Sequence, residues 1–184
     1  MKKYIPLHVH SMYSLLDGLS KPEQIADRCE EIGVKSCALT DHGNIAGAIK
    51  FYSAMKKRGI KPILGCELYI CDDDATVKDK ENRKLSHFLV LAKNYDGWKN
   101  LIRIVSESNR PEHYYFKPRL DLKRLGEIMD GNMIGICGHL GSTLANKLMP
   151  DGVIVSDWEE VGKSYISQFK DIFGEENFFL EAQL

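Results

Sequence analysis

The chain has 184 residues, of which 43% are hydrophobic and 28% charged, and its formal net charge is −1. This length suits one domain with a sizeable core, and the near-neutral charge excludes a bulk basic field that would draw the surface onto nucleic acid. We find no apolar run of the ~18 residues that a membrane span needs, and no signal peptide. Five scattered cysteines without a Cys-x-x-Cys pair favour a reducing compartment, so we expect a cytoplasmic protein without a membrane partner.

The stretch that organises the chain lies at its start. Apolar and polar side chains alternate over residues 5–10, which predicts a strand with His8 and His10 on the same face. Two residues of rise separate the imidazoles by roughly 6.5 Å, so both can reach one metal ion or two bridged ions. Asp17, beside the chain-breaking Gly18, can bring a carboxylate back to the same place. The plainer alternative is a half-exposed edge strand whose polar side chains point outward.

Helices and strands alternate after this segment. Buried stripes that include Ile32, Ile49 and Tyr52 predict two amphipathic helices with a short strand between them. Strand–helix alternation is typical of a parallel α/β sheet or barrel, whose site forms at the carboxyl ends of the strands. The predicted elements are a helix from a capping box at 20–23 to residue 33, a strand over 36–40, a helix ending near residue 59 and a strand over 61–70.

The strand predicted at 87–93 breaks this rule, because His87 opens it instead of closing it. We therefore predict that it runs antiparallel to the 61–70 strand, which would bring His87 beside Glu67. The acidic run at 72–74 lies in a polar loop and is interpreted as solvated. Further along we expect a helix capped by Asp96, a loop over 110–119, a helix over 121–129, a strand over 133–137, a helix over 142–149, a helix over 156–174 and a last strand over 177–183.

Histidines gather at the ends of the predicted strands. Five of the six do so, whereas His113 lies in a long loop and is interpreted as a surface or substrate-side residue. Mixed nitrogen and oxygen ligands suit zinc, manganese or iron(II) better than magnesium or calcium. Seven candidates exceed the needs of one tetrahedral ion, which predicts a bridged cluster that activates water for phosphoester hydrolysis. The candidate metal ligands are His8, His10, Asp17, His42, Glu67, His87 and His139, with Glu67 as the natural bridge.

Several segments resemble the polymerase-and-histidinol-phosphatase (PHP) domain, a superfamily of metal-dependent phosphoesterases. They are more similar still to its version at the N-terminus of the family C replicative polymerases of bacteria, the DNA polymerase III alpha subunits. The segments are 7–18, 39–43, 59–70, 87–94 and 117–121. The resemblance implies an α/β fold, a distorted barrel of the (β/α)7 type, with residues 1–184 forming one PHP domain. It also implies up to three ions on the ligands named above, with His139 in place of a family cysteine.

The resemblance has one departure that matters. The family pattern ends in an Asp-x-His pair on the last barrel strand, and none follows Glu181 here. We therefore expect a barrel that is incomplete at its C-terminal end, with a gap between its first and last strands and a tendency to self-associate. The polymerase aspartates are also absent, so this chain alone is not expected to polymerise DNA.

The activity that the resemblance implies is 3′–5′ exonuclease or related phosphodiester hydrolysis by metal-bound water during DNA replication. His8, His10, Asp17 and Glu67 would be catalytic, and Arg119 would contact phosphate. Implied partners are DNA or nucleotide phosphates, the rest of the polymerase chain, a proofreading exonuclease subunit and the sliding clamp. Two alternatives stay open: a stand-alone small-molecule phosphatase of the histidinol-phosphatase type, and a non-catalytic scaffold for the polymerase and its proofreading subunit.

Overall fold

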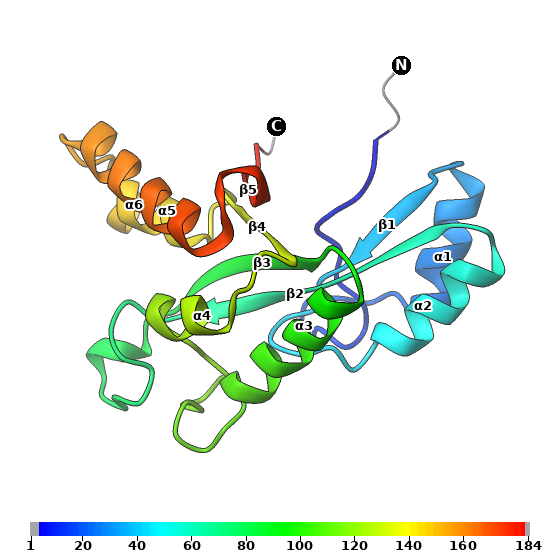
Figure 1. Cartoon of the computed structure of the whole chain (residues 1–184), viewed down its shortest axis with the longest axis horizontal. Helices are drawn as coiled ribbons and strands as arrows, with labels where there is room; N and C mark the ends of the chain where they lie inside the picture. The colour runs from blue at the N-terminus through cyan, green and yellow to red at the C-terminus, as the bar shows by residue number, and fades with distance from the viewer. Residues whose placement is uncertain (1–3, 183–184) are drawn as a thin grey trace.

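The computed structural model describes residues 4–182, and its centre is a five-stranded sheet in the order β1-β2-β3-β4-β5 (Figure 1). Neighbours β1 and β2 are parallel, as are β4 and β5, whereas β3 runs antiparallel to both β2 and β4. The antiparallel pairing of β2 with β3 confirms the predicted hairpin. The strands are β1 (Ser36–Leu39), β2 (Lys61–Ile70), β3 (Ser86–Ala92), β4 (Met133–Cys137) and β5 (Phe178–Leu180).

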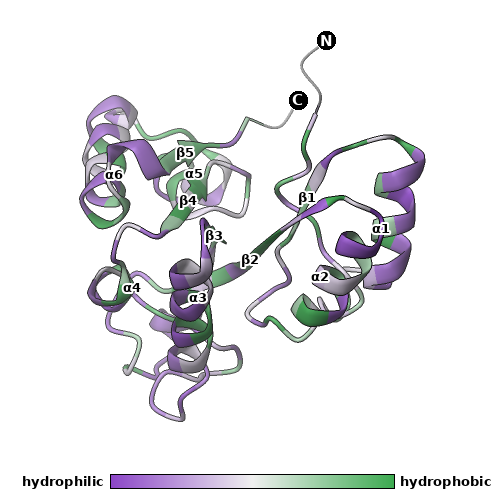
Figure 2. Cartoon of the chain, turned by 45° about the vertical axis from the view of Figure 1, so that its right-hand side comes forward, coloured by the Kyte–Doolittle hydropathy of each residue, from purple (hydrophilic) through white to green (hydrophobic). Residues whose placement is uncertain are grey.

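Helices cover the outer side of this sheet. Figure 1 shows α1 and α2 packed together next to β1, α3 and α4 beneath the central strands, and α5 and α6 beside β4. Figure 2 shows hydrophobic residues concentrated along the strands, whereas α1 is largely hydrophilic. The helices are α1 (Pro22–Glu31), α2 (Ala48–Lys57), α3 (Tyr95–Ser108), α4 (Leu122–Ile128), α5 (Thr143–Leu148) and α6 (Trp158–Phe173), with 3₁₀ turns at Glu81–Arg83, Pro150–Gly152 and Glu175–Asn177.

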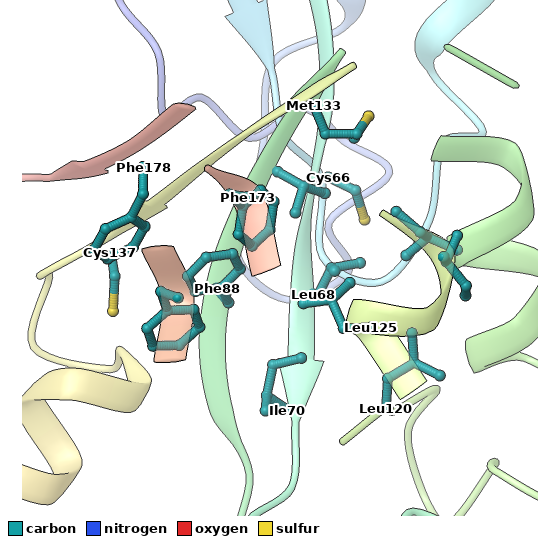
Figure 3. Close-up of a cluster of buried hydrophobic side chains, with 14 of the residues drawn as sticks. Cys66, Leu68, Ile70, Phe88, Leu120, Leu125, Met133, Cys137, Phe173 and Phe178 are labelled. Carbon is teal, nitrogen blue, oxygen red and sulfur yellow. The ribbon is translucent and has the colours of Figure 1, made fainter. Parts of the chain in front are cut away.

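One face of the β2–β3 hairpin packs against the helices, and the other faces the interior of the barrel. Leu68 and Phe88 are cross-strand partners that face the helices, where Phe88 stacks on Phe169 with ring centroids 4.6 Å apart (Figure 3). Side chains alternate along a strand, so Glu67 and its partner Leu89 face the interior of the barrel. The helix-covered face supplies the main core, which leaves the interior face free to carry the site.

The predicted first strand is wrong in detail. Residues 5–9 lie beside β1 but have no regular strand structure, and His8 is in a bend. Two backbone hydrogen bonds join them to β1 and the residue after it: Ala38 N–H donates to the Pro6 carbonyl at 2.8 Å and Thr40 N–H to the Val9 carbonyl at 2.9 Å. Pro6 has no N–H, and the Val9 N–H donates to the Thr40 hydroxyl at 2.9 Å. The ladder therefore does not continue into a regular strand.

Some helix faces and caps also differ from the prediction. Ile49 and Tyr52 are 67% and 46% exposed, because α2 buries Phe51 beside the predicted Met55, and Ile32, the residue after α1, is 50% exposed. The predicted caps are shifted by one or two residues: α1 begins after Lys21, α3 after Asn94 and α6 after Asp157. Gln183, the end of the predicted last strand, lies outside the described residues.

The sheet is not closed, which is consistent with an incomplete barrel. Within residues 4–182, β5 pairs with β4 alone, and an apolar hollow of about 1360 Å³ separates it from the N-terminal segment. Ile5 and Leu7 line one side of this hollow, and Phe179 and Leu180 line the other. None of the helices in the described part of the chain is long and apolar enough to cross a membrane.

Candidate metal centre

The strand-end histidines meet at one end of the sheet. His42 follows β1 and His139 follows β4, so both lie at the carboxyl ends of these strands. His87 lies at the start of β3, which is the same end of the sheet because β3 is antiparallel to its neighbours. The N-terminal segment beside β1 adds His8 and His10.

Glu67, which is 2% exposed, is the centre of this group. Its Oε2 lies 2.9 Å from Nε2 of His10, 3.1 Å from Nδ1 of His42 and 3.2 Å from Nε2 of His8; its Oε1 lies 2.8 Å from Nδ1 of His87 and 3.1 Å from Nε2 of His139. One buried carboxylate therefore contacts all five of the candidate histidines. This is the position that a bridging ligand needs.

Asp17 closes the set from the solvent side. Its Oδ2 lies 3.0 Å from Nε2 of His42 and 3.9 Å from Nδ1 of His10, and its side chain is 55% exposed. Donor atoms within 4.8 Å of one another form four groups of three: His8, His10 and Glu67; His42, Glu67 and His87; His10, Asp17 and His42; and His8, His139 and Glu181. The structure thus brings all seven predicted ligands together, while their binding of metal stays a prediction.

Three imidazole nitrogens have a property that fits a metal ion. Among the residues that the structure describes, three buried ring nitrogens lack a hydrogen bond of good geometry: Nδ1 of His42 and Nε2 of His139, which only approach Glu67 oxygens at 3.1 Å, and Nδ1 of His139. Buried polar atoms are nearly always paired, because leaving one unpaired costs free energy. A lone pair aimed at a cation would resolve this, and the nitrogen-rich donor set suits zinc, manganese or iron(II).

The electrostatics of the group favour an ionised Glu67. Burial opposes ionisation, but close contacts with the imidazoles of four histidines outweigh it and hold the pKa of Glu67 well below its usual range. Burial lowers the pKa of His8, yet its contacts with Glu67 and Glu181 prevail and raise it overall. His42 shows the opposite balance: burial lowers its pKa, and the nearby His10 and His87 add to that effect.

Glu181 belongs to the site and is absent from the predicted set. It follows β5, its Oε2 lies 3.3 Å from Nδ1 of His8, and its N–H donates to the Cys137 carbonyl at 2.7 Å. A Cβ on Gly138 would lie 2.4 Å from the Glu181 carbonyl, so only glycine allows this approach. The strand-end rule that selected the histidines also points to Glu181, once β5 is recognised as parallel to β4.

The expected phosphate contact of Arg119 is wrong. Its guanidinium is fully buried and takes no part in the metal centre, because it ties the loops at 71–86 and 110–119 together. It donates to the carbonyls of Ala75, Val77, Asn82 and His113 at 2.5–3.2 Å. His113 is not a surface residue either: it is 8% exposed, and its Nδ1 lies 2.9 Å from the Glu107 carbonyl.

A different cation lies beside the site. Tyr69 is buried next to the centre, its ring 5.8 Å from that of His42 and 5.1 Å from that of His87. Lys117 Nζ lies 3.2 Å from the Tyr69 hydroxyl and 4.3 Å from the centre of its ring. Lys117 is exposed, so it can offer its charge to a bound anion, which Arg119 cannot.

Residues 6–184 match the sequence profile of the PHP domain family. The chain belongs to this family. Its curated relatives include the DNA polymerase III alpha subunits of Borreliella burgdorferi and Helicobacter pylori, 40% and 38% identical over 183 residues. Each alignment covers 98% of this chain but only 15% of the relative, so the chain spans about a seventh of their length. It is thus a PHP domain of the kind found in these subunits.

Two solved structures share the PHP fold with this chain. One, assigned as a metal-dependent phosphoesterase of Bifidobacterium adolescentis, has a TM-score of 0.56 at 13% identity and is matched over 96% of this chain and 76% of its own. The other, an amidohydrolase of Chromobacterium violaceum, has a TM-score of 0.57 at 16% identity and is matched over 95% and 75%. At these identities the likeness establishes the fold alone.

Proposed function

We propose that this PHP domain binds a cluster of up to three divalent ions and hydrolyses phosphodiester bonds in DNA or nucleotides, as a 3′–5′ exonuclease module of a replicative polymerase. The observation that carries the proposal is the convergence of five imidazoles on the buried carboxylate of Glu67. Similarity to polymerase alpha subunits supports the role in replication.

Zinc, manganese or iron ions bound there would supply Lewis-acid activation of water and positive charge for phosphoryl oxygens. The residues divide the remaining tasks. Glu67 holds two halves of the donor set together, since Oε2 faces His8, His10 and His42 while Oε1 faces the other two histidines. Asp17 is the exposed member at the mouth of the site, and Lys117 offers a positive charge to the substrate phosphate.

The same similarity supports a proposal about the wider setting. We place the domain in a cytoplasmic polymerase chain that works with a proofreading exonuclease subunit and a sliding clamp. The relatives that suggest these partners are aligned with this chain over 15% of their own length. Co-purification of the chain with each candidate subunit tests it, and failure to bind any of them would contradict it.

The deciding experiment loads the purified chain with zinc, manganese or iron(II) and offers it end-labelled single-stranded DNA or histidinol phosphate. We expect metal-dependent release of nucleotides from the 3′ end, which His8→Ala should abolish and His113→Gln should retain. Hydrolysis of histidinol phosphate alone would indicate a small-molecule phosphatase. Stoichiometric metal without hydrolysis of either substrate would overturn the catalytic proposal and indicate a scaffold.

A further inference from the structure

A buried carboxylate outside the predicted ligand set fastens the loop that carries Asp17. Asp41 is 1% exposed, and Ser11 and Ser14 in this loop are fully buried. Asp41 Oδ1 accepts from the Ser11 N–H and from the Ser14 hydroxyl, both at 2.7 Å, and Oδ2 accepts from the Ser11 hydroxyl at 2.8 Å. Both carboxylate oxygens of Asp41 therefore accept hydrogen bonds from this loop.

Ser14 connects Asp41 to His10, one of the candidate metal ligands. Its Oγ lies 2.9 Å from Nδ1 of His10 and accepts the His42 N–H at 3.1 Å. A serine hydroxyl has one proton, and here it points to Asp41. The oxygen can only accept from its other neighbours, so His10 must carry its proton on Nδ1. Its Nε2, which lies 2.9 Å from Oε2 of Glu67, is then the nitrogen left to face the site and a metal ion.

The same serine positions Asp17 through the backbone. The Ser14 carbonyl accepts the N–H groups of Asp17 at 3.0 Å and Gly18 at 2.9 Å. The turn is tight, since a Cβ on Gly18 would lie 2.0 Å from the Ser11 carbonyl oxygen. Leu16 adopts a φ of 68°, a conformation that costs a leucine free energy and that the surrounding contacts must hold.

We propose that Asp41 and Ser14 are positioning residues, which keep a proton on Nδ1 of His10, so that Nε2 faces the site, and hold Asp17 at the mouth of the site. Partners that orient metal-ligating histidines in this way tune the affinity of many metal sites. The proposal deepens the proposed function and rests on its metal cluster. The proton on Nδ1 of His10 is nevertheless a property of the metal-free chain and can be measured there.

The test uses the 184-residue chain with ¹⁵N-labelled histidine. Long-range ¹H–¹⁵N spectra of the metal-free protein report which nitrogen of His10 carries the proton, and dialysis against zinc or manganese gives the metal affinity. Ser14→Ala removes the acceptor for Nδ1–H. Ser11→Ala is the matched control, because Ser11 is as buried as Ser14 and contacts Asp41 but not His10.

We expect a proton on Nδ1 of His10 in the wild type and in Ser11→Ala, partial loss of that proton in Ser14→Ala, and a metal affinity about 10- to 100-fold lower in Ser14→Ala alone. In Asp41→Leu the serine proton is free to turn toward His10, so Nδ1 should lose its proton, whereas Asp41→Asn keeps an acceptor oxygen and should preserve it. An Nδ1 that stays fully protonated in Ser14→Ala, or equal affinity losses in both serine variants, would overturn the proposal. A wild type that binds no metal would overturn the proposed function, while the metal-free spectra still decide whether Nδ1 is protonated.

Discussion

Glu67 and His87 meet through their side chains although their backbones are not partners. Oε1 of Glu67 lies 2.8 Å from Nδ1 of His87, yet the ladder pairs Glu67 with Leu89 and His87 with Tyr69. They are diagonal neighbours on one face of an antiparallel pair, a separation that long side chains can bridge. The hairpin thereby brings the start of β3 to a site that otherwise collects the ends of strands.

We expect Glu67→Gln to lower metal content far more than His113→Gln. The carboxylate carries the charge that offsets two cations, whereas His113 contacts the Glu107 carbonyl outside the centre. Metal affinity should fall more than about tenfold in Glu67→Gln. Elemental analysis of both variants after dialysis measures this, and equal metal content would refute the role of Glu67.

Stabilisation by metal should weaken as the pH falls from about 7.5 to about 5.5, because ligating histidines must be neutral. The pKa of His8 is raised above 6.5, so in the metal-free chain its ion pairs stabilise the fold at low pH and lose their effect as the pH rises through that pKa. Metal must displace this proton, which favours binding at the higher pH.

Thermal unfolding of the chain without manganese, with manganese, and after a chelator has removed the manganese measures this pH dependence. At a metal concentration 100 times the dissociation constant, the gain is about 2.7 kcal/mol. We expect this gain in the free energy of unfolding near pH 7.5, and we expect most of the gain to be lost near pH 5.5. Equal stabilisation at both pH values would argue against histidine ligands.

Arg119→Lys should destabilise the fold by about 2–4 kcal/mol without changing metal content, since one ammonium cannot reach four carbonyls held by a planar guanidinium. Arg103→Lys on the exposed face of α3 is the control and should stay within about 0.5 kcal/mol. Urea unfolding measures both. Normal stability combined with weaker substrate binding would restore the phosphate role of Arg119.

The open edge of the sheet should make the chain self-associate. Phe179 and Leu180 on β5 are 51% and 54% exposed beside the apolar hollow, and an exposed edge strand pairs readily with other chains. Phe179→Lys should reduce association in analytical ultracentrifugation, whereas Ile32→Lys, which removes an exposed isoleucine at the end of α1, should not. A wild type that stays monomeric at every concentration tested would contradict this prediction.

Local sequence was sufficient for much of the fold and most of the site. Strand periodicity, helix stops and the reversed position of His87 predicted the hairpin. The rule of polar residues at strand ends selected five histidines and Glu67, and the chain break at Gly18 added Asp17; the structure brings all seven together. These features are local or depend on the order of the elements, so no knowledge of distant contacts was required.

Only the tertiary structure decided the roles of the remaining residues, because those roles depend on which distant segments of the chain meet. Arg119 is a typical phosphate ligand in isolation, but the loop carbonyls around it bury it completely. Asp41 precedes a candidate ligand and gives no local sign that it fastens Ser11 and Ser14, about 30 residues earlier in the chain. Glu181 became part of the site only when the parallel pairing of β4 and β5 placed it next to His8. A buried polar group must find its partners wherever the fold provides them, and periodicity carries no information about those partners.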